Sequence, residues 1–83
     1  MKNWFVYIVE CSDGSYYCGM TSDIDKRVKT HNEGNGAKYT MSRLSVKLLA
    51  SKGVTTKGAA LSLEYKVKQQ KKELKIEFLL NYK

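Results

Sequence analysis

The sequence contains no hydrophobic run of membrane-spanning length, few cysteines and no proline. None of its apolar stretches approaches the ~20 residues that a transmembrane helix needs. The N-terminus runs directly into a strand-like stretch, so we expect no signal peptide. Two cysteines form no metal-binding motif and fit a reducing compartment, the cytoplasm. At this length we expect one domain, residues 1–83, with a thin hydrophobic core.

Acidic residues are also scarce. Eight aspartates and glutamates stand against fifteen lysines and arginines, which gives a formal net charge of +7 at pH 7. Such an excess favours a polyanionic partner, and nucleic acid is the main candidate. Charge alone leaves open the alternative that the protein is merely basic.

Two runs rich in aromatic and β-branched residues, 4–11 and 15–19, predict a β-hairpin. Asp13-Gly14 lies between them, and this dipeptide is a strong hairpin signal when it is flanked by such runs. The two strands and their turn are therefore the element around which we expect the chain to fold.

The length of this turn decides which side chains share a face of the sheet. A two-residue loop would place Tyr7 and Tyr17 on opposite faces. A three-residue loop, with Gly14 in the left-handed region as a G1 bulge, points both phenols the same way. Gly19 then lies opposite Tyr7 and leaves room for its ring. We predict the three-residue turn, in which the two cysteines point to opposite faces and form no disulfide.

A helix is predicted next, because apolar residues recur at helical spacing after the hairpin. Thr21, Ser22 and Asp23 supply capping side chains, and Ser22 with Asp25 resembles a capping box. Gly34 is a natural residue at which the helix ends.

The remaining segments alternate between helix and strand. We predict a short helical turn over residues 38–43 and a third strand over 46–50 that is bounded by Gly53. A helix over 57–69 follows, capped by a threonine, Thr55 or Thr56. A last helix over 72–80 is either separate or a continuation, since no glycine or proline divides the two. The order β-β-α-β-α-α predicts an α+β domain, a small three-stranded antiparallel sheet flanked by helices.

Several side chains suit phosphodiester hydrolysis, which needs a base, a positive charge at the developing oxyanion and stabilisation of the leaving oxygen. Arg27 and His31 are four residues apart, so they lie on one ridge of their helix. The phenols of Tyr7 and Tyr17 have an ordinary pKa of about 10 and act as bases only where nearby cations favour the phenolate. Which tyrosine activates water, and whether His31 is a base or a positioning group, stays open.

Glu64 is the sole plausible metal ligand, because it lies beside the apolar stripe of the helix over residues 57–69. One carboxylate together with water and substrate phosphate suits Mg²⁺ or Mn²⁺, which keep much of their hydration. Candidates for contact with the nucleic-acid backbone, which positions a partner without reading its sequence, are Ser15, Thr21, Lys38, Tyr39, Arg43 and Lys47.

The sequence VYI at residues 6–8 and YCG at residues 17–19 resembles the signature of the GIY-YIG nuclease family. The resemblance covers nearly the whole chain and continues through Gly19-Met20-Thr21, Arg27, His31-Asn32, Gly36-Ala37-Lys38-Tyr39-Thr40 and Glu64. A valine replaces the first glycine, and a cysteine replaces the usual isoleucine. The small stand-alone bacterial group of single GIY-YIG domains is most similar. The resemblance implies that the two tyrosines, the arginine, the histidine and a metal-binding glutamate perform single-metal hydrolysis.

The resemblance also directs attention to the C-terminal region, because many members of the family carry a late asparagine near the metal. Asn81 is the one late candidate, close to the end of the chain. Its match to the family asparagine stays open.

We therefore expect a metal-dependent DNA endonuclease, acting on branched or single-stranded DNA in repair or recombination. One alternative is a nucleic-acid-binding module with little or no nuclease activity, and another is a domain recruited by a partner protein. Nothing in the sequence resembles a base-reading helix or an attached specificity domain. We expect a monomer that binds DNA with little regard to sequence.

Overall fold

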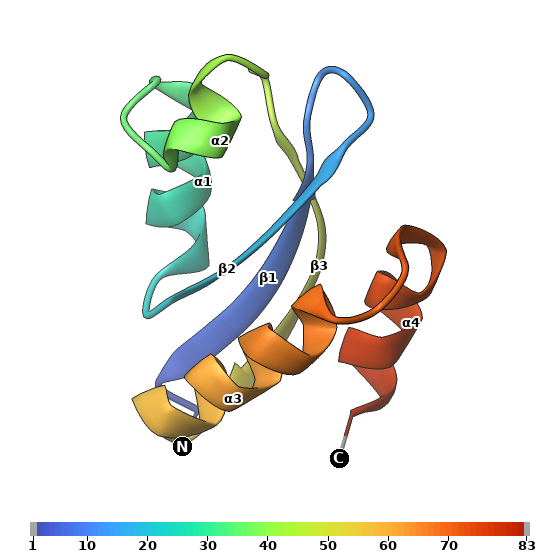
Figure 1. The fold of residues 1–83 in the computed structure, drawn as a ribbon. Helices are drawn as coiled ribbons and strands as arrows, with labels where there is room; N and C mark the ends of the chain where they lie inside the picture. The colour runs from blue at the N-terminus through green and yellow to red at the C-terminus, as the bar shows by residue number, and fades with distance from the viewer. Residues whose placement is uncertain (1, 83) are drawn as a thin grey trace.

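The computed structural model describes residues 2–82, so the domain predicted over 1–83 extends one residue beyond this range at each end. An antiparallel sheet and four helices make up the fold (Figure 1). In chain order the elements are β1 (Trp4–Glu10), β2 (Tyr16–Thr21), α1 (Ile24–Asn32), α2 (Lys38–Met41), β3 (Lys47–Val54), α3 (Lys57–Lys68) and α4 (Lys72–Asn81). The predicted α+β architecture is confirmed, with the helical turn over residues 38–43 realised as α2.

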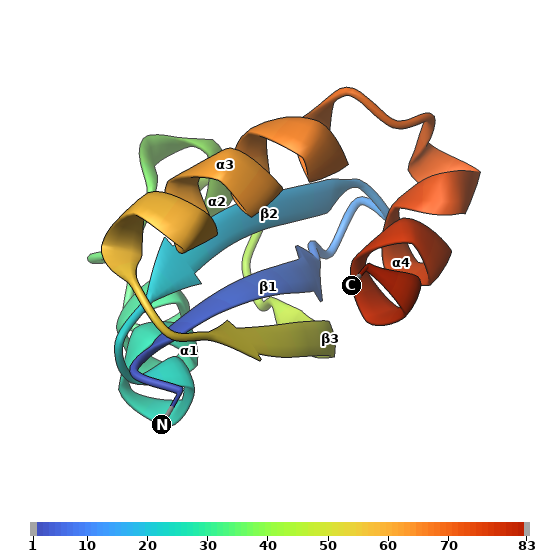
Figure 2. The same ribbon diagram turned by 90° about the horizontal axis from the view of Figure 1, so that it is seen from below.

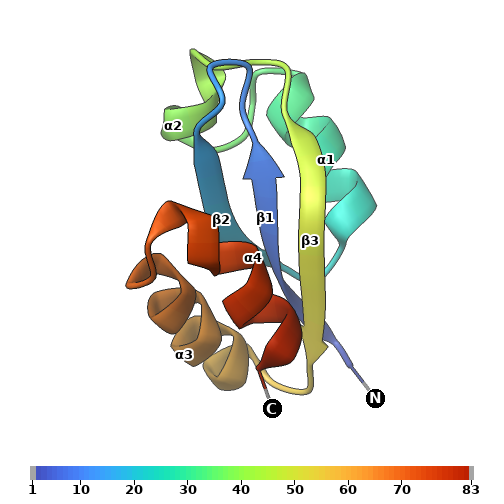
Figure 3. The same ribbon diagram turned by 90° about the vertical axis from the view of Figure 1, so that its right-hand side faces the viewer.

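The strands lie in the order β2-β1-β3, with β1 in the centre. Helices α1 and α2 lie on one face of the sheet, and α3 and α4 on the other (Figures 2 and 3). Alternate residues of β1 therefore enter two separate cores. Val6 and Ile8 pack with α3 and α4, whereas Tyr7 and Val9 pack with α1. No helix in the described range is long and apolar enough to cross a lipid bilayer.

The hairpin has the predicted three-residue turn. Gly14 adopts a φ of 83°, in the left-handed region where a glycine carries no steric penalty. Its N–H donates to Cys11 O at 2.9 Å, and Cys11 N–H donates to Ser15 O at 2.8 Å. In this register Tyr7 lies opposite Gly19. The two cysteines belong to different cores and both are free thiols.

The predicted capping box at the start of α1 is wrong. Asp23, not Ser22, is the N-cap, and its carboxylate accepts a hydrogen bond from Lys26 N–H at 3.1 Å. Thr21 contributes one step earlier, because its hydroxyl accepts from Asp23 N–H at 3.1 Å. The helix therefore begins one residue later than a Ser22 cap would require, which leaves Asp25 in the first turn rather than in a box.

The third strand is longer than the predicted 46–50. It runs to Val54 and passes through Gly53, which pairs with Phe5 of β1 instead of ending the strand. A Cβ at Gly53 would lie 3.0 Å from the Cβ of Lys2 and 3.2 Å from the Phe5 ring, so the glycine leaves room for both side chains.

The last two helices are separate. Thr56 caps α3 by accepting from Ala59 N–H at 3.0 Å. At the other end the Lys75 ammonium reaches back from α4 and donates to Val67 O and Lys68 O, at 3.1 and 3.2 Å. Because a cation satisfies the last carbonyls of α3, this helix ends without a glycine or proline.

Candidate active site

A buried tyrosine of the central strand is the hub of the α1-side face. The Tyr7 side chain is only 1% exposed. Its hydroxyl lies 2.9 Å from His31 Nε2 and accepts a hydrogen bond from Arg27 Nε at 3.3 Å. Arg27 and His31 project from one ridge of α1, as their spacing predicts, so strand and helix together bring a phenol, an imidazole and a guanidinium into contact.

Two glycines make room for this cluster. A Cβ at Gly19 would lie 2.5 Å from the Tyr7 hydroxyl oxygen, and one at Gly36 would clash with the ring of His31 and lie 2.8 Å from its Cα. Neither glycine has an unusual φ, so close approach rather than backbone conformation requires them.

The buried imidazole is held on its other side by a residue that the sequence analysis did not single out. The Thr40 hydroxyl donates to Ala37 O at 2.9 Å, and its oxygen lies 2.8 Å from His31 Nδ1. We assign the imidazole proton to Nδ1, which donates to Thr40, so that Nε2 accepts from the Tyr7 hydroxyl. Ala37 N–H also approaches Nδ1 but at 3.4 Å, too long to compete.

This arrangement favours neutral groups in the absence of substrate. Burial raises the pKa of the Tyr7 phenol, and the hydrogen bond and charge of Arg27 oppose it only in part. Burial and the Arg27 charge lower the pKa of His31. The cation beside the phenol thus does not by itself produce a phenolate at Tyr7. The same hydrogen bond to Tyr7, with a lesser one to Tyr17, raises the pKa of Arg27.

Tyr17 lies on the same face, as the three-residue turn requires, but is only partly buried. Its ring centroid is 6.4 Å from that of Tyr7 and 5.5 Å from that of His31. On its outer side it stacks on Tyr39 of α2 at 5.9 Å. The site therefore has a buried phenol and a more accessible one, both beside the guanidinium of Arg27.

Arg43, a predicted backbone contact, is engaged within the protein. Its guanidinium covers the Tyr39 ring at 4.1 Å, and its Nε donates to Asp13 Oδ2 at 3.0 Å. Hydrogen bonds from Ser15 and the contact with Arg43 lower the pKa of Asp13. The hairpin turn is thereby tied to α2, and the predicted contact Ser15 is part of the same network.

The other predicted backbone contacts are dispersed. Thr21 is occupied by the cap of α1, whereas Lys38 and Lys47 are exposed at the starts of α2 and β3. Lys38 is the neighbour of Tyr39 in α2, whereas Thr21 and Lys47 belong to other elements.

Glu64 lies on the other layer, in α3. Its side chain is 19% exposed and forms an ion pair with Lys68 at 3.6 Å. Helix α3 packs on β2, which brings Glu64 near Cys18. Burial, and after it the Glu64 charge, raise the pKa of the Cys18 thiol to about 11. Helix α3 runs along β2, an edge strand whose other side carries Tyr17 (Figure 2). Glu64 and the phenol–imidazole cluster thus flank one edge of the sheet from opposite faces.

A divalent ion would find limited protein coordination here. Residues 2–82 contain no group of three or more histidine, cysteine, aspartate or glutamate side chains placed to hold a metal. A single partly exposed carboxylate is compatible with Mg²⁺ or Mn²⁺, which retain several waters and use substrate phosphate as a ligand. The Lys68 ammonium would have to release Glu64 for this to occur.

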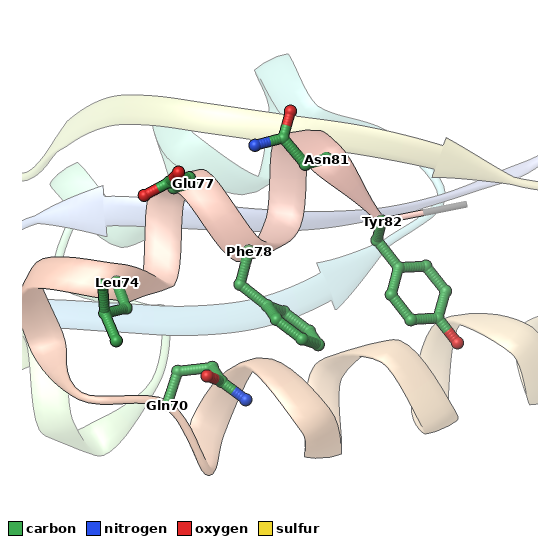
Figure 4. A pocket seen from close by; sticks show the side chains of 6 residues that line it. All are labelled: Gln70, Leu74, Glu77, Phe78, Asn81 and Tyr82. Carbon is green, nitrogen blue, oxygen red and sulfur yellow. The ribbon is translucent and has the colours of Figure 1, made fainter.

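Asn81 lies in α4, on the same face of the sheet as the α3 helix of Glu64 and opposite the Tyr7–His31 cluster (Figure 3), and its approach to a metal at Glu64 stays a prediction. It lines a pocket of about 440 Å³ beside α4, together with Leu74, Phe78 and Tyr82 (Figure 4). Its amide points away from the Phe78 ring in that view. The structure therefore does not bring Asn81 to Tyr7 and His31.

The sequence analysis gave no role to Thr40 and Gly36, which it named only as part of the family resemblance, and the structure shows both against the ring of His31. Asn32 has a similar role, since its side chain accepts from Val46 N–H at 2.7 Å and donates to Val46 O at 3.2 Å, which fixes the end of α1 to the segment before β3. One signal was present in the sequence. A lone histidine followed within ten residues by a glycine and a threonine offers a ring, space for it and a partner.

Comparison with known proteins identifies relatives over the whole fold. The GIY-YIG catalytic domain family matches residues 3–77. The UPF0213 protein YazA of Bacillus subtilis is 49% identical over 99% of this chain and 86% of its own length. A UPF0213 protein of Streptococcus pneumoniae is 48% identical over 90% of this chain and 76% of its own length.

Two solved structures share the fold. The solution structure of UPF0213 protein BH0048 from Bacillus halodurans has a TM-score of 0.57 at 40% identity, over 95% of this chain and 84% of its own. The solution structure of EF2693 from E. faecalis has a TM-score of 0.64 at 31% identity, over 99% of this chain and 91% of its own. The family match, the relatives and the paired tyrosines agree, and the chain belongs to the GIY-YIG family of catalytic domains.

Proposed function

We propose that the protein is a divalent-metal-dependent endonuclease that hydrolyses DNA phosphodiester bonds. The observation that carries the proposal is the buried chain of hydrogen bonds in which the Tyr7 hydroxyl joins His31 Nε2 to Arg27 Nε. A structural tyrosine needs one partner, whereas this one is held between a proton acceptor and a permanent cation. Net charge of +7 supports a polyanionic substrate.

Exposure divides the roles of the two phenols. Tyr7 is too deeply buried to meet a substrate, so with His31 it holds Arg27 in place. The more accessible Tyr17 faces the substrate, and Arg27 beside it stabilises negative charge, either on the phenolate or on the phosphate oxyanion. His31 Nε2 accepts the hydrogen bond of the Tyr7 hydroxyl and thereby fixes the phenol oxygen that holds Arg27.

Glu64 would hold the divalent ion, together with water and substrate phosphate. When bound, the ion would supply positive charge for the leaving oxygen, a contribution worth several kcal/mol. Because Lys68 is paired with Glu64, substrate phosphate that attracts the ammonium would free the carboxylate for this role.

The Lys68–Glu64 pair also favours a second candidate, a nucleic-acid-binding module with little nuclease activity. In that case the ion pair would persist, and basic side chains would bind DNA without turnover.

Cleavage assays separate the two. We would incubate branched and single-stranded DNA with the protein in Mg²⁺, Mn²⁺ or EDTA, alongside Tyr17→Phe, with Leu80→Ala as a control on an exposed site of α4. Metal-dependent cleavage that Tyr17→Phe abolishes and Leu80→Ala retains supports the endonuclease. DNA binding with no cleavage in either metal supports the binding module.

A further inference from the structure

Helix α3 carries an exposed ridge that packing does not explain. Leu61, Glu64, Tyr65 and Lys68 follow one another at spacings of three and four residues, so they share one flank of the helix. The buried stripe, which includes Leu63 and faces the sheet, lies beside this flank. Leu61 is 51% exposed and Tyr65 is 66% exposed, which leaves two large apolar side chains adjacent in solvent.

The ridge faces the edge of the sheet rather than the neighbouring helix. On the opposite flank of α3, Lys66 contacts Tyr82, the residue directly after α4, with its ammonium 2.9 Å from the Tyr82 hydroxyl. The ridge therefore points away from α4, toward the side of α3 that borders β2. Glu64 on the ridge influences Cys18 of β2, which agrees with this orientation. Figure 3 shows α3 across β2 with α4 over the centre of the sheet.

Aromatic rings and ammonium groups both lie along this border. Lys68 lies on the ridge within one turn of Tyr65. Further along, Lys72 lies 4.7 Å from the ring centroid of Tyr16, a residue of β2 on the same face, and donates to Gly14 O at 2.5 Å. Glu64 is the one carboxylate of the ridge, and Lys68 already offsets its charge at 3.6 Å.

We propose that Leu61, Tyr65 and Lys68 form a stacking platform for an unpaired nucleotide of single-stranded DNA. An exposed ring beside a cation is the combination with which proteins bind single strands, because each base has a face to stack and each nucleotide a phosphate to neutralise. A duplex keeps its bases inside the helix and cannot offer them to Tyr65.

The platform rests on the proposed function, because it borders the edge strand that carries Tyr17. A single strand that crosses this edge would present a phosphate to the Arg27 side and a neighbouring base to the α3 side. The platform thereby selects DNA that is unpaired next to the cleaved bond.

Binding without metal tests the platform independently of cleavage. Fluorescence anisotropy of labelled oligothymidylate and of a blunt duplex of the same length would be measured in EDTA over a salt series. Tyr65→Ala should weaken single-strand binding by roughly fivefold to 150-fold, the range for loss of one stacked base. Tyr65→Phe, which keeps the ring, should remain within about twofold of wild type by the same principle. Lys68→Gln should make the salt slope shallower by about 0.7, one phosphate contact.

Two control variants match these changes elsewhere. Leu80→Ala removes an exposed apolar side chain from α4, and Lys29→Gln removes an exposed charge from α1. Neither should reproduce the loss caused by Tyr65→Ala, and duplex binding should be little changed in all the Tyr65 variants. Equal loss for duplex and single strand, normal binding by Tyr65→Ala, or no oligothymidylate binding by wild type would overturn the platform.

The outcome is distinguishable from that of the nuclease assays. Tyr65-dependent binding without any cleavage would keep the platform and reject the endonuclease. Cleavage by a Tyr65→Ala variant with wild-type binding would keep the endonuclease and reject the platform.

Discussion

The two faces of the sheet are built from different chemistry. On the α3–α4 face the buried residues are aliphatic, with Ile8, Leu63 and Leu79 among the largest, and Cys18 beside them. On the α1–α2 face the buried residues include His31 and Thr40, each fully buried and hydrogen-bonded. Both faces exclude water, but on the α1–α2 face the described residues do so around a chain of hydrogen-bonded polar side chains.

The difference places apolar packing on the α3–α4 layer and the buried hydrogen-bonded side chains on the α1–α2 layer. Apolar packing is non-directional, and its loss costs stability in proportion to the volume removed. A buried chain of hydrogen bonds instead requires every donor and acceptor to have its partner. The hairpin makes the separation possible, because alternate residues of β1 point to opposite layers. Glu64 is the exception, since it belongs to the apolar layer and is proposed to act with the polar one.

Replacement of Glu64 should have the largest effect, because it tests whether a residue of the apolar layer acts with the polar one. Glu64→Gln keeps the shape and nearly all the helix propensity and loses only the partly exposed ion pair with Lys68, so the free energy of unfolding should fall by no more than about 0.5 kcal/mol. Turnover should fall by orders of magnitude, because the metal's contribution is worth several kcal/mol and each ~1.4 kcal/mol is tenfold in rate. DNA binding should persist. The measurements are cleavage in Mg²⁺, DNA binding in EDTA and a thermal melt. Full activity in a folded variant would remove Glu64 from the site.

A substitution in the apolar layer should instead lower stability. Leu63→Ala deletes a side chain that is 1% exposed and should lower the free energy of unfolding by about 2–5 kcal/mol. Urea unfolding would measure this loss, with Leu80→Ala, at a 53% exposed position, as the control. A loss no larger in Leu63→Ala than in the control would contradict the assignment of stability to this layer.

The polar layer can be tested without a large change in volume. Thr40→Val keeps the shape of the side chain but removes the hydroxyl beside His31 Nδ1. A buried imidazole nitrogen then lacks its partner, which should cost about 1–3 kcal/mol of stability. Thr40→Ser retains the hydroxyl and serves as the matched variant. Urea unfolding measures the stability of both variants. Equal stability of the valine and serine variants would show that the hydrogen bond contributes little to the free energy of unfolding.

The hairpin turn, its register and the ridge of α1 that build the polar layer were predictable from local sequence. Asp13-Gly14 between two β-forming runs predicts the turn, and strict alternation in a strand then fixes which residues face Tyr7. Arg27 and His31 fall on one ridge for the same kind of reason, a helical period of 3.6 residues. Both inferences need only residues close together in the chain.

The errors lie where distant segments decide the outcome. Gly53 predicts a strand end locally, but pairing with Phe5 extends β3 through it. Thr40 contacts His31 only because the loop before α2 folds back over α1, which no periodicity predicts. The N-cap at Asp23 instead of Ser22 reflects a competition among three adjacent capping residues, in which the Thr21 hydroxyl selects Asp23 by accepting its N–H.

The smallest expected effect is a pH dependence that belongs to the polar layer alone. Burial and Arg27 lower the pKa of His31 in the folded protein below its ordinary value of about 6.5. The unfolded chain therefore binds more protons than the folded one between the lowered pKa and about 6.5, and stability falls as the pH drops through this window. The slope contributed by one histidine is at most about 1.4 kcal/mol per pH unit. Urea unfolding at pH 7.5 and at pH 5.5 would measure it, with His31→Gln as the variant in which this contribution disappears. The two proteins carry the same acidic side chains, so the difference between the two curves isolates the imidazole. Parallel curves would show that His31 titrates alike in the folded and unfolded chains.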